Sequence, residues 1–321
     1  MRPAPLGSGV VTPSPRSLRG SLLLLVAALI WGSAFVAQRF GAEHMAFASF
    51  TAVRHALGAL VLLVVVAVFD RGARRTRTER ASLWRAALLP GLGVGVALSG
   101  GSLLQQAGLE TTTAGNAGFI TGMYMVFIPI VSWVVFRQRT GRWTWLGAVL
   151  GLAGLYLLSV RANFSVNTGD LLVLGCAVFW TGHILALERL GSLDPFRLCV
   201  VQFATCAVVS LVVAVVMEPA PLSGVMQTLG PLAYAAFLST GVGFTLQVVG
   251  QRDAPASYAA LIMALEAVFA ALGGALVLGE RMDLRAIVGA ALMLVAVIVA
   301  QLGTVLTARP APEPLPHVPE P

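Results

Sequence analysis

The sequence predicts an all-α integral membrane protein in which ten transmembrane helices form two inverted five-helix repeats. Three observations support this fold class: the composition is apolar, the chain divides into ten apolar stretches, and its second half repeats the first. Hydrophobic residues make up 57% of the 321 residues and charged residues 11%, with a mean hydropathy of +0.86. A water-soluble chain of this length could not bury so much apolar surface, whereas a bilayer accepts it.

The ten apolar stretches are separated by turn-forming or charged residues. A helix needs about 20 residues to cross the hydrocarbon core. The predicted spans are 18–38, 47–69, 86–107, 114–135, 143–160, 170–187, 196–217, 229–250, 256–278 and 284–304. No small-residue cleavage site follows the first span, so we expect an uncleaved helix rather than a signal peptide.

These spans divide the chain into four parts. Residues 1–17 form a cytoplasmic N-terminal segment, 18–160 the first five-helix repeat and 170–304 the second. Residues 305–321 form a proline-rich tail that we expect to be disordered.

The internal repeat is visible in matched residues. At an offset of 142, Gln105 corresponds to Gln247 and Gly108 to Gly250. Further upstream the offset is 149, and Trp31 corresponds to Trp180. A membrane chain built from two similar halves is typical of secondary transporters, which bind substrate between the repeats near the bilayer midplane.

The placement of arginine predicts the orientation. Most arginines fall in loops that share one side of the membrane, above all the loop between Asp70 and Arg85. Cytoplasmic loops are enriched in basic residues, so both termini are expected in the cytoplasm of a plasma (cell inner) membrane protein. Each half has an odd number of spans, so the second half enters the membrane inverted.

The composition argues against several other classes of protein. The net charge of +7 is expected of a polytopic membrane protein, and no nucleic-acid-binding motif accompanies it. The three cysteines, Cys176, Cys199 and Cys206, lie inside apolar segments without the spacing of a disulfide framework or metal site. There is no Walker A motif, nucleophile elbow or paired catalytic carboxylates, so we expect no enzyme, cofactor or ATP-driven pump.

Several motifs carry a family resemblance. They are the Trp31-Gly32-Ser33 turn, Phe50 with Arg54, and the stretch Leu265–Gly289 with its Gly279-Glu280 pair. With ten spans in two inverted halves, the chain resembles the drug/metabolite transporter superfamily, in particular its EamA-type members. One departure is that the first-half equivalent of Gly279-Glu280 is Arg137-Gln138, which lacks the usual acid.

The resemblance implies an alternating-access carrier with a central cavity. The third, fourth, eighth and ninth helices would form much of its lining, together with the first and sixth. Members of the family move amino acids, other small metabolites or drugs, often outward, so the resemblance implies a small-molecule substrate and efflux.

Glu266 is the leading candidate for a functional group in the membrane. An ionisable residue in hydrocarbon is costly and therefore faces a cavity or a partner. Tyr258 and Ile262 precede it by eight and four residues, on the face that we expect to form a cavity wall. The first-half equivalents are Asn116, Ile120 and Tyr124. Glu266 could bind a substrate amine or carry a coupling proton; alternatively, it belongs to a structural hydrogen-bond network.

The other candidates also have two interpretations. Arg54 could reach the membrane interface, pair with an acid or bind an anionic group of the substrate. His183 is either a proton relay or a packed, hydrogen-bonded side chain. Gln105 and Gln247 could bind substrate from both halves or bond across helices, and Trp31 and Trp180 line the cavity or pack between helices.

The leading hypothesis is therefore a proton- or gradient-coupled exporter of a small metabolite, amino acid or drug. An uptake permease of the same fold is the alternative within transport. A non-transporting membrane scaffold and an intramembrane enzyme are alternatives from other classes. The sequence is compatible with a monomer or a homodimer.

Overall fold

The computed structural model describes residues 15–138, 140–159, 167–277 and 283–307, which form helices and their connections. Backbone polar groups find no water in hydrocarbon, so a span must bond them internally, as an α-helix does. Motif residues Gly279 and Glu280, the tail from residue 308 and residues 1–14 of the N-terminal segment lie outside the described residues.

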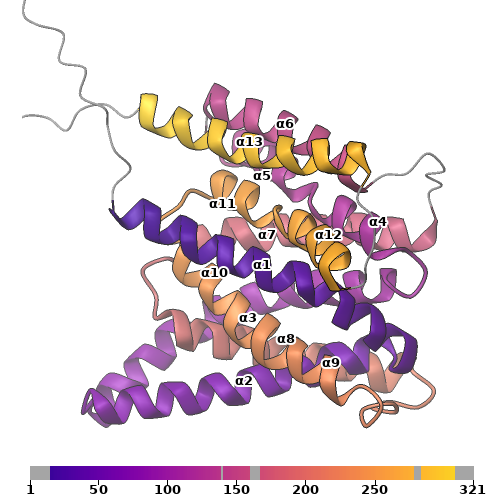
Figure 1. Ribbon diagram of the computed structural model, residues 1–321. Helices are drawn as coiled ribbons and strands as arrows, with labels where there is room; N and C mark the ends of the chain where they lie inside the picture. The colour runs from indigo at the N-terminus through magenta and orange to yellow at the C-terminus, as the bar shows by residue number, and fades with distance from the viewer. Residues whose placement is uncertain (1–14, 139, 160–166, 278–282, 308–321) are drawn as a thin grey trace, which may run out of the picture.

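The described helices assemble into the ten predicted spans (Figure 1). The first half holds α1 (Pro15–His44), α2 (Phe47–Gly72), α3 (Arg77–Gly108), α4 (Ala114–Thr121) continued by α5 (Tyr124–Val134), and α6 (Arg142–Ser159). The second half holds α7 (Thr168–Arg189), α8 (Pro195–Met217), α9 (Leu229–Ala233) continued by η1 (Tyr234–Phe244) and α10 (Thr245–Gly250), α11 (Ala256–Met263) continued by α12 (Glu266–Val277), and α13 (Leu284–Thr307).

Eight of these spans are long and apolar enough to be identified as membrane-crossing from length and composition. The other two are α6, which begins with Arg142 and two tryptophans, and the interrupted pair α11 and α12, whose apolar part Ala256–Leu272 is shorter. The prediction of an all-helical membrane fold is confirmed.

The start of α3 differs from the sequence-based expectation. The sequence predicts that this span begins at residue 86, after the charged stretch from Asp70 to Arg85, but the helix begins at Arg77. Thr76 and Glu79 form a capping box: the Glu79 amide donates to Thr76 Oγ1 at 3.2 Å and the Thr76 amide to Glu79 Oε2 at 2.7 Å. The cap bonds free amides at the start of the helix, which begins nine residues before the predicted apolar span.

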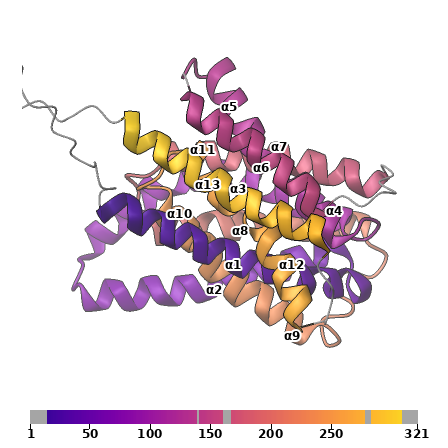
Figure 2. The ribbon, with the colours of Figure 1, turned by 45° about the horizontal axis from the view of Figure 1, so that its top comes forward.

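Helices from the two halves pack against each other throughout the bundle. Figures 1 and 2 show α13 alongside α6, with α1 running across the centre between them and α2. A Cβ atom added to Gly154 would lie 2.7 Å from the Gly289 carbonyl oxygen, so α6 and α13 cross in close backbone contact. Small residues permit such contacts where lipid supplies no hydrophobic force.

The antiparallel helices α2 and α8 are joined at both ends by carboxylates. Near the end of α2, Asp70 accepts two bonds of 2.5 Å from Arg197 in the first turn of α8. Just after α8, Glu218 accepts from the backbone amides of Ala48 at 2.8 Å and Ser49 at 3.1 Å, which cap α2. A carboxylate at the end of each helix therefore bonds the first turn of the other, at the Arg197 side chain in α8 and at the backbone amides in α2.

The pair formed by Arg197 and Asp70 yields a prediction on stability. Only 2% of the Arg197 side chain and 6% of the Asp70 side chain are exposed. Because Asp70→Asn leaves a buried guanidinium without its main counter-charge, we expect it to destabilise the fold by about 3–5 kcal/mol. Thermal unfolding of the detergent-solubilised protein measures this.

The matched control is Glu43→Gln, which breaks the exposed 3.5 Å ion pair with Arg39. Such pairs contribute about 0–1 kcal/mol, so its melting temperature should stay near that of the wild type. Equal melting temperatures for Asp70→Asn and Glu43→Gln would contradict the role assigned to the buried pair.

Candidate functional site

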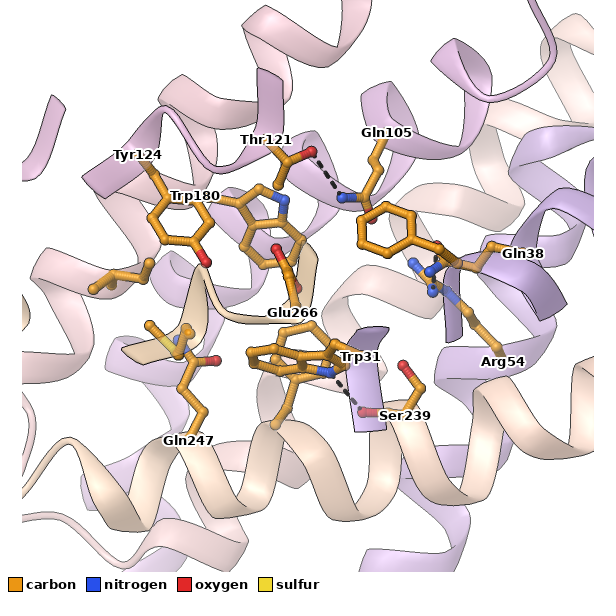
Figure 3. Close-up of a pocket in the computed structure, with 14 residues that line it drawn as sticks. Trp31, Gln38, Arg54, Gln105, Thr121, Tyr124, Trp180, Ser239, Gln247 and Glu266 are labelled. Atoms are coloured by element: carbon orange, nitrogen blue, oxygen red, sulfur yellow. Dashed lines mark hydrogen bonds between the residues drawn. The ribbon is translucent and has the colours of Figure 1, made fainter. Parts of the chain in front are cut away.

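A partly open cavity lies between the two halves, and the space among its lining atoms, open solvent included, is about 510 Å³. Its lining comes from spans of both repeats (Figure 3). The lining residues are Trp31, Phe35, Gln38, Arg54, Gln105, Thr121, Tyr124, Trp180, Ile184, Ser239, Phe244, Gln247, Met263 and Glu266.

Most of this lining obeys the internal repeat. The corresponding pairs are Trp31 with Trp180, Phe35 with Ile184, Gln105 with Gln247, Thr121 with Met263, and Tyr124 with Glu266. Arg54 is an exception, because the residue that corresponds to it in the second half is Phe203, which is buried in the core and does not line the cavity. The walls are thus symmetric in position but not in charge.

Two helix interruptions at corresponding positions shape the cavity. The fourth span breaks at Gly122 and Met123, and the ninth at Ala264 and Leu265. At each break a backbone hydrogen bond joins residues three apart instead of four. The Met123 amide donates to the Ile120 carbonyl at 3.2 Å and the Leu265 amide to the Ile262 carbonyl at 3.1 Å. These tight turns keep the backbone bonded inside hydrocarbon while they change the direction of the side chains.

Tyr124 and Glu266 are the first residues after the two breaks and face each other. The Tyr124 hydroxyl lies beside the Glu266 carboxyl (Figure 3). Both residues are buried, with 4% and 6% of their surfaces exposed. Within the described chain no cation forms an ion pair with Glu266, so its carboxyl stays available to another donor.

Arg54 lies on another side of the cavity from Glu266 (Figure 3). It is 3% exposed, and its Nη1 donates to Gln38 Oε1 at 3.1 Å. Its buried Nε has no hydrogen-bond partner, and none of the described carboxylates pairs with it. A buried guanidinium without a counter-charge is costly.

Aromatic rings separate the polar groups. Trp31 and Trp180 each pack on Phe244, with ring centroids 4.9 and 5.6 Å apart. The Trp31 Nε1 donates to the Ser239 carbonyl at 3.1 Å. That carbonyl belongs to η1, an 11-residue π-helical segment. The π-helix is a rare conformation that is frequent at functional sites.

Seven of the ten predicted site residues line this one cavity. They are Trp31, Arg54, Gln105, Tyr124, Trp180, Gln247 and Glu266. Their roles remain predictions, but the structure brings their side chains together from spans far apart in the sequence.

The expectation that a single face of the ninth helix forms the wall is wrong. Met263 and Glu266 line the cavity, whereas Tyr258 and Ile262 do not, because the break after Met263 rotates the next helix, α12, relative to α11. Tyr258 instead lies near the start of α11, beside Ser21 of α1.

Two further predicted residues lie away from the lining. Asn116 is half-buried in the first turn of α4, where its backbone amide donates to Thr113 Oγ1 at 3.1 Å. His183 is fully buried behind Trp180, and its Nε2 bonds Gln202 Oε1 at 2.9 Å. This placement favours the packing interpretation of His183 over a proton relay.

Sequence reasoning missed half of the lining. Phe35 and Ile184 follow the two matched tryptophans by four residues, and Thr121 and Met263 precede the matched pair Tyr124 and Glu266 by three. The repeat could have identified these four. Ser239 and Phe244 depend on the π-helical path of η1, which no sequence pattern indicated.

The site has the character of a binding cavity. Over the described residues no three side chains of His, Cys, Asp or Glu gather in a way that could hold a metal ion. The cavity is lined by aromatic and aliphatic side chains together with one acid, one base and several amides. Such a lining is typical of sites for small polar molecules.

Comparisons with known proteins match this chain to membrane transporters. The EamA-like transporter family matches residues 18–160 and again 167–301. An uncharacterized transporter of Archaeoglobus fulgidus is 32% identical over 89% of this chain and 87% of its own. The threonine/homoserine exporter RhtA of Salmonella typhimurium is 30% identical over 82% and 83%, and that of Escherichia coli 29% identical over 90% and 91%.

The fold also matches a solved structure. A crystal structure superposes with a TM-score of 0.72 at 18% sequence identity, over 90% of this chain and 99% of its own. At this identity the likeness concerns the fold alone.

Gly32 provides a test of how α1 positions Glu266. A Cβ atom at Gly32 would lie 2.5 Å from the Glu266 carbonyl oxygen and 2.8 Å from Phe269 Cβ. We expect Gly32→Ala to separate α1 from α12, to destabilise the protein by about 1–3 kcal/mol and to lower ligand binding in the cavity. Thermal unfolding and ligand-induced thermal shifts measure both effects.

Gly182 in α7 is the matched control, because a Cβ atom there would meet nothing within 4 Å. Alanine at this position should be neutral or slightly stabilising. If Gly32→Ala behaved like Gly182→Ala, the close approach of α1 to α12 would not control the cavity.

Proposed function

Because the chain belongs to the EamA-like transporter family, we propose that it exports a small zwitterionic amino acid by alternating access, driven by protons. It is a multi-pass membrane transporter for a small molecule and not an enzyme. The observation that carries the substrate class is the pair of opposite, separately placed groups in one cavity, Arg54 and Glu266.

The guanidinium of Arg54 suits a carboxylate. It is buried, retains a free Nε and has no acidic partner among the described residues. A substrate carboxylate would supply the missing counter-charge through charge-assisted hydrogen bonds. We therefore assign the α-carboxylate of the amino acid to this corner.

Glu266 suits the ammonium of the same molecule. It has a neutral partner, Tyr124, and no cationic one in the described part of the chain. Its carboxyl can hold a proton or neutralise an ammonium group, but not both at once. Alternate occupancy by proton and substrate would couple proton entry to amino-acid exit.

The direction and topology are part of the proposal. The described ends of α1 and α13 lie on the same side of the bundle, as an even number of spans requires (Figure 1). With both termini in the cytoplasm, the arginine-rich ends face inward. Export is supported by the relatives named as threonine/homoserine exporters. Because the two repeats of one chain together line the cavity, we propose that a monomer suffices.

The test is flux of labelled L-threonine in proteoliposomes with an imposed pH gradient. Wild-type protein should move threonine against its gradient as protons move the other way. Arg54→Gln removes the carboxylate partner, so we expect flux to fall at least tenfold, corresponding to roughly 1.4 kcal/mol or more. Glu266→Gln cannot exchange a proton, and the pH gradient should no longer drive transport.

Arg80→Gln and Glu43→Gln are matched controls, because both side chains are exposed and neither lines the cavity. They should transport like the wild type. Flux equal to that of empty liposomes for a full panel of amino acids would refute the proposal. Gradient-driven flux through Glu266→Gln would refute only its coupling role.

A further inference from the structure

We propose that Gln247 selects the side chain of the transported amino acid by accepting a hydrogen bond from a side-chain hydroxyl. Hydroxy amino acids would then be preferred over apolar amino acids of the same shape. The inference rests on the proposed amino-acid transport and extends it to specificity.

A relay of amides fixes the orientation of Gln247. The Gln251 Nε2 donates to the Ile184 carbonyl oxygen at 3.1 Å, which leaves Gln251 Oε1 as an acceptor. The Gln247 Nε2 donates to that oxygen at 2.9 Å. Since a carbonyl oxygen can only accept, each amide in the relay has one permitted orientation, and Gln247 must present its Oε1 on the opposite side.

That oxygen is buried and lacks a hydrogen-bond partner among the described residues. Gln247 itself is only 1% exposed. Figure 3 shows its amide oxygen directed toward the cavity and its nitrogen directed away. Buried acceptors are nearly always bonded, so an orphan oxygen aimed into a binding cavity indicates a donor on the ligand.

The position of Gln247 assigns that donor to the side chain of the substrate. Arg54 and Gln247 lie on opposite sides of the cavity, with Glu266 between them (Figure 3). A carboxylate at Arg54 and an ammonium at Glu266 therefore direct the side chain of the amino acid toward Gln247. Ile184 and Met263 also line this cavity and are apolar, so the neutral amide oxygen suits a hydroxyl rather than a charged group.

The repeat shows that this arrangement exists in one half only. Gln105 corresponds to Gln247, but the position corresponding to Gln251 is Leu109. Without that relay, Gln105 donates instead to Thr121 Oγ1 at 3.2 Å. The two symmetric amides thus differ in what they offer a ligand, and Gln105 is the matched control for Gln247.

The experiment measures competing export of L-threonine and L-valine from proteoliposomes. The two are close in shape and differ by a hydroxyl in place of a methyl group. Wild-type protein should prefer threonine by about tenfold, the ratio expected of one neutral hydrogen bond that is otherwise left unmade. L-serine against L-alanine gives a second, independent ratio.

Gln247→Leu removes the acceptor and should bring both ratios close to one. Gln105→Leu should change the two fluxes of each pair by the same factor and leave the ratios at the wild-type value. If Gln247→Leu fails to fold, Gln251→Leu keeps Gln247 but releases its amide, and should lower the threonine preference while valine flux continues.

The outcomes separate this inference from the function on which it rests. Wild-type export of threonine and valine at equal rates would overturn the role of Gln247 and leave amino-acid transport intact. Equal losses of both substrates in Gln247→Leu would also overturn it, since the oxygen would then serve the ammonium. Absence of flux for every amino acid would refute the proposed function and the inference together.

Discussion

The requirement that backbone groups stay bonded inside hydrocarbon governs how this protein makes room for a ligand. The fourth and ninth spans are interrupted at corresponding positions, and three-residue turns keep their amides paired through each break. The breaks end one helix at Thr121 and the other at Met263 and begin new ones at Tyr124 and Glu266. All four side chains line the cavity. Without these interruptions a continuous helix would present other residues.

Around this symmetric frame the charges are asymmetric. Arg54 has Phe203 as its repeat partner, and Glu266 has Tyr124. A site between two similar halves therefore carries one base and one acid that are not neutralised by each other. This arrangement suits the proposed ligand, which carries both charges and binds between the two halves.

Several close contacts between helices lie away from the cavity lining. Helices α2 and α8 are joined at one end by Asp70 with Arg197 and at the other by Glu218 at the start of α2. Close backbone contact joins α6 to α13 at Gly154 and Gly289. By contrast, α1 crosses the centre of the bundle and contacts the interrupted ninth span at Gly32. A displacement of α1 would therefore also displace the backbone at Glu266.

The sequence by itself determined the membrane class, the spans and the repeat, because hydropathy and arginine placement are properties of composition that the bilayer imposes on any chain. It also identified Glu266, Arg54 and the paired Gln105 and Gln247, since polar residues in hydrocarbon are conspicuous. Only the tertiary structure decided that Tyr258 and Asn116 lie off the cavity, because helix breaks rotate side chains without leaving a periodic signal. The orientation of the Gln247 amide likewise depends on a relay that ends at Ile184, 63 positions earlier in the chain, and packing alone brings those groups together.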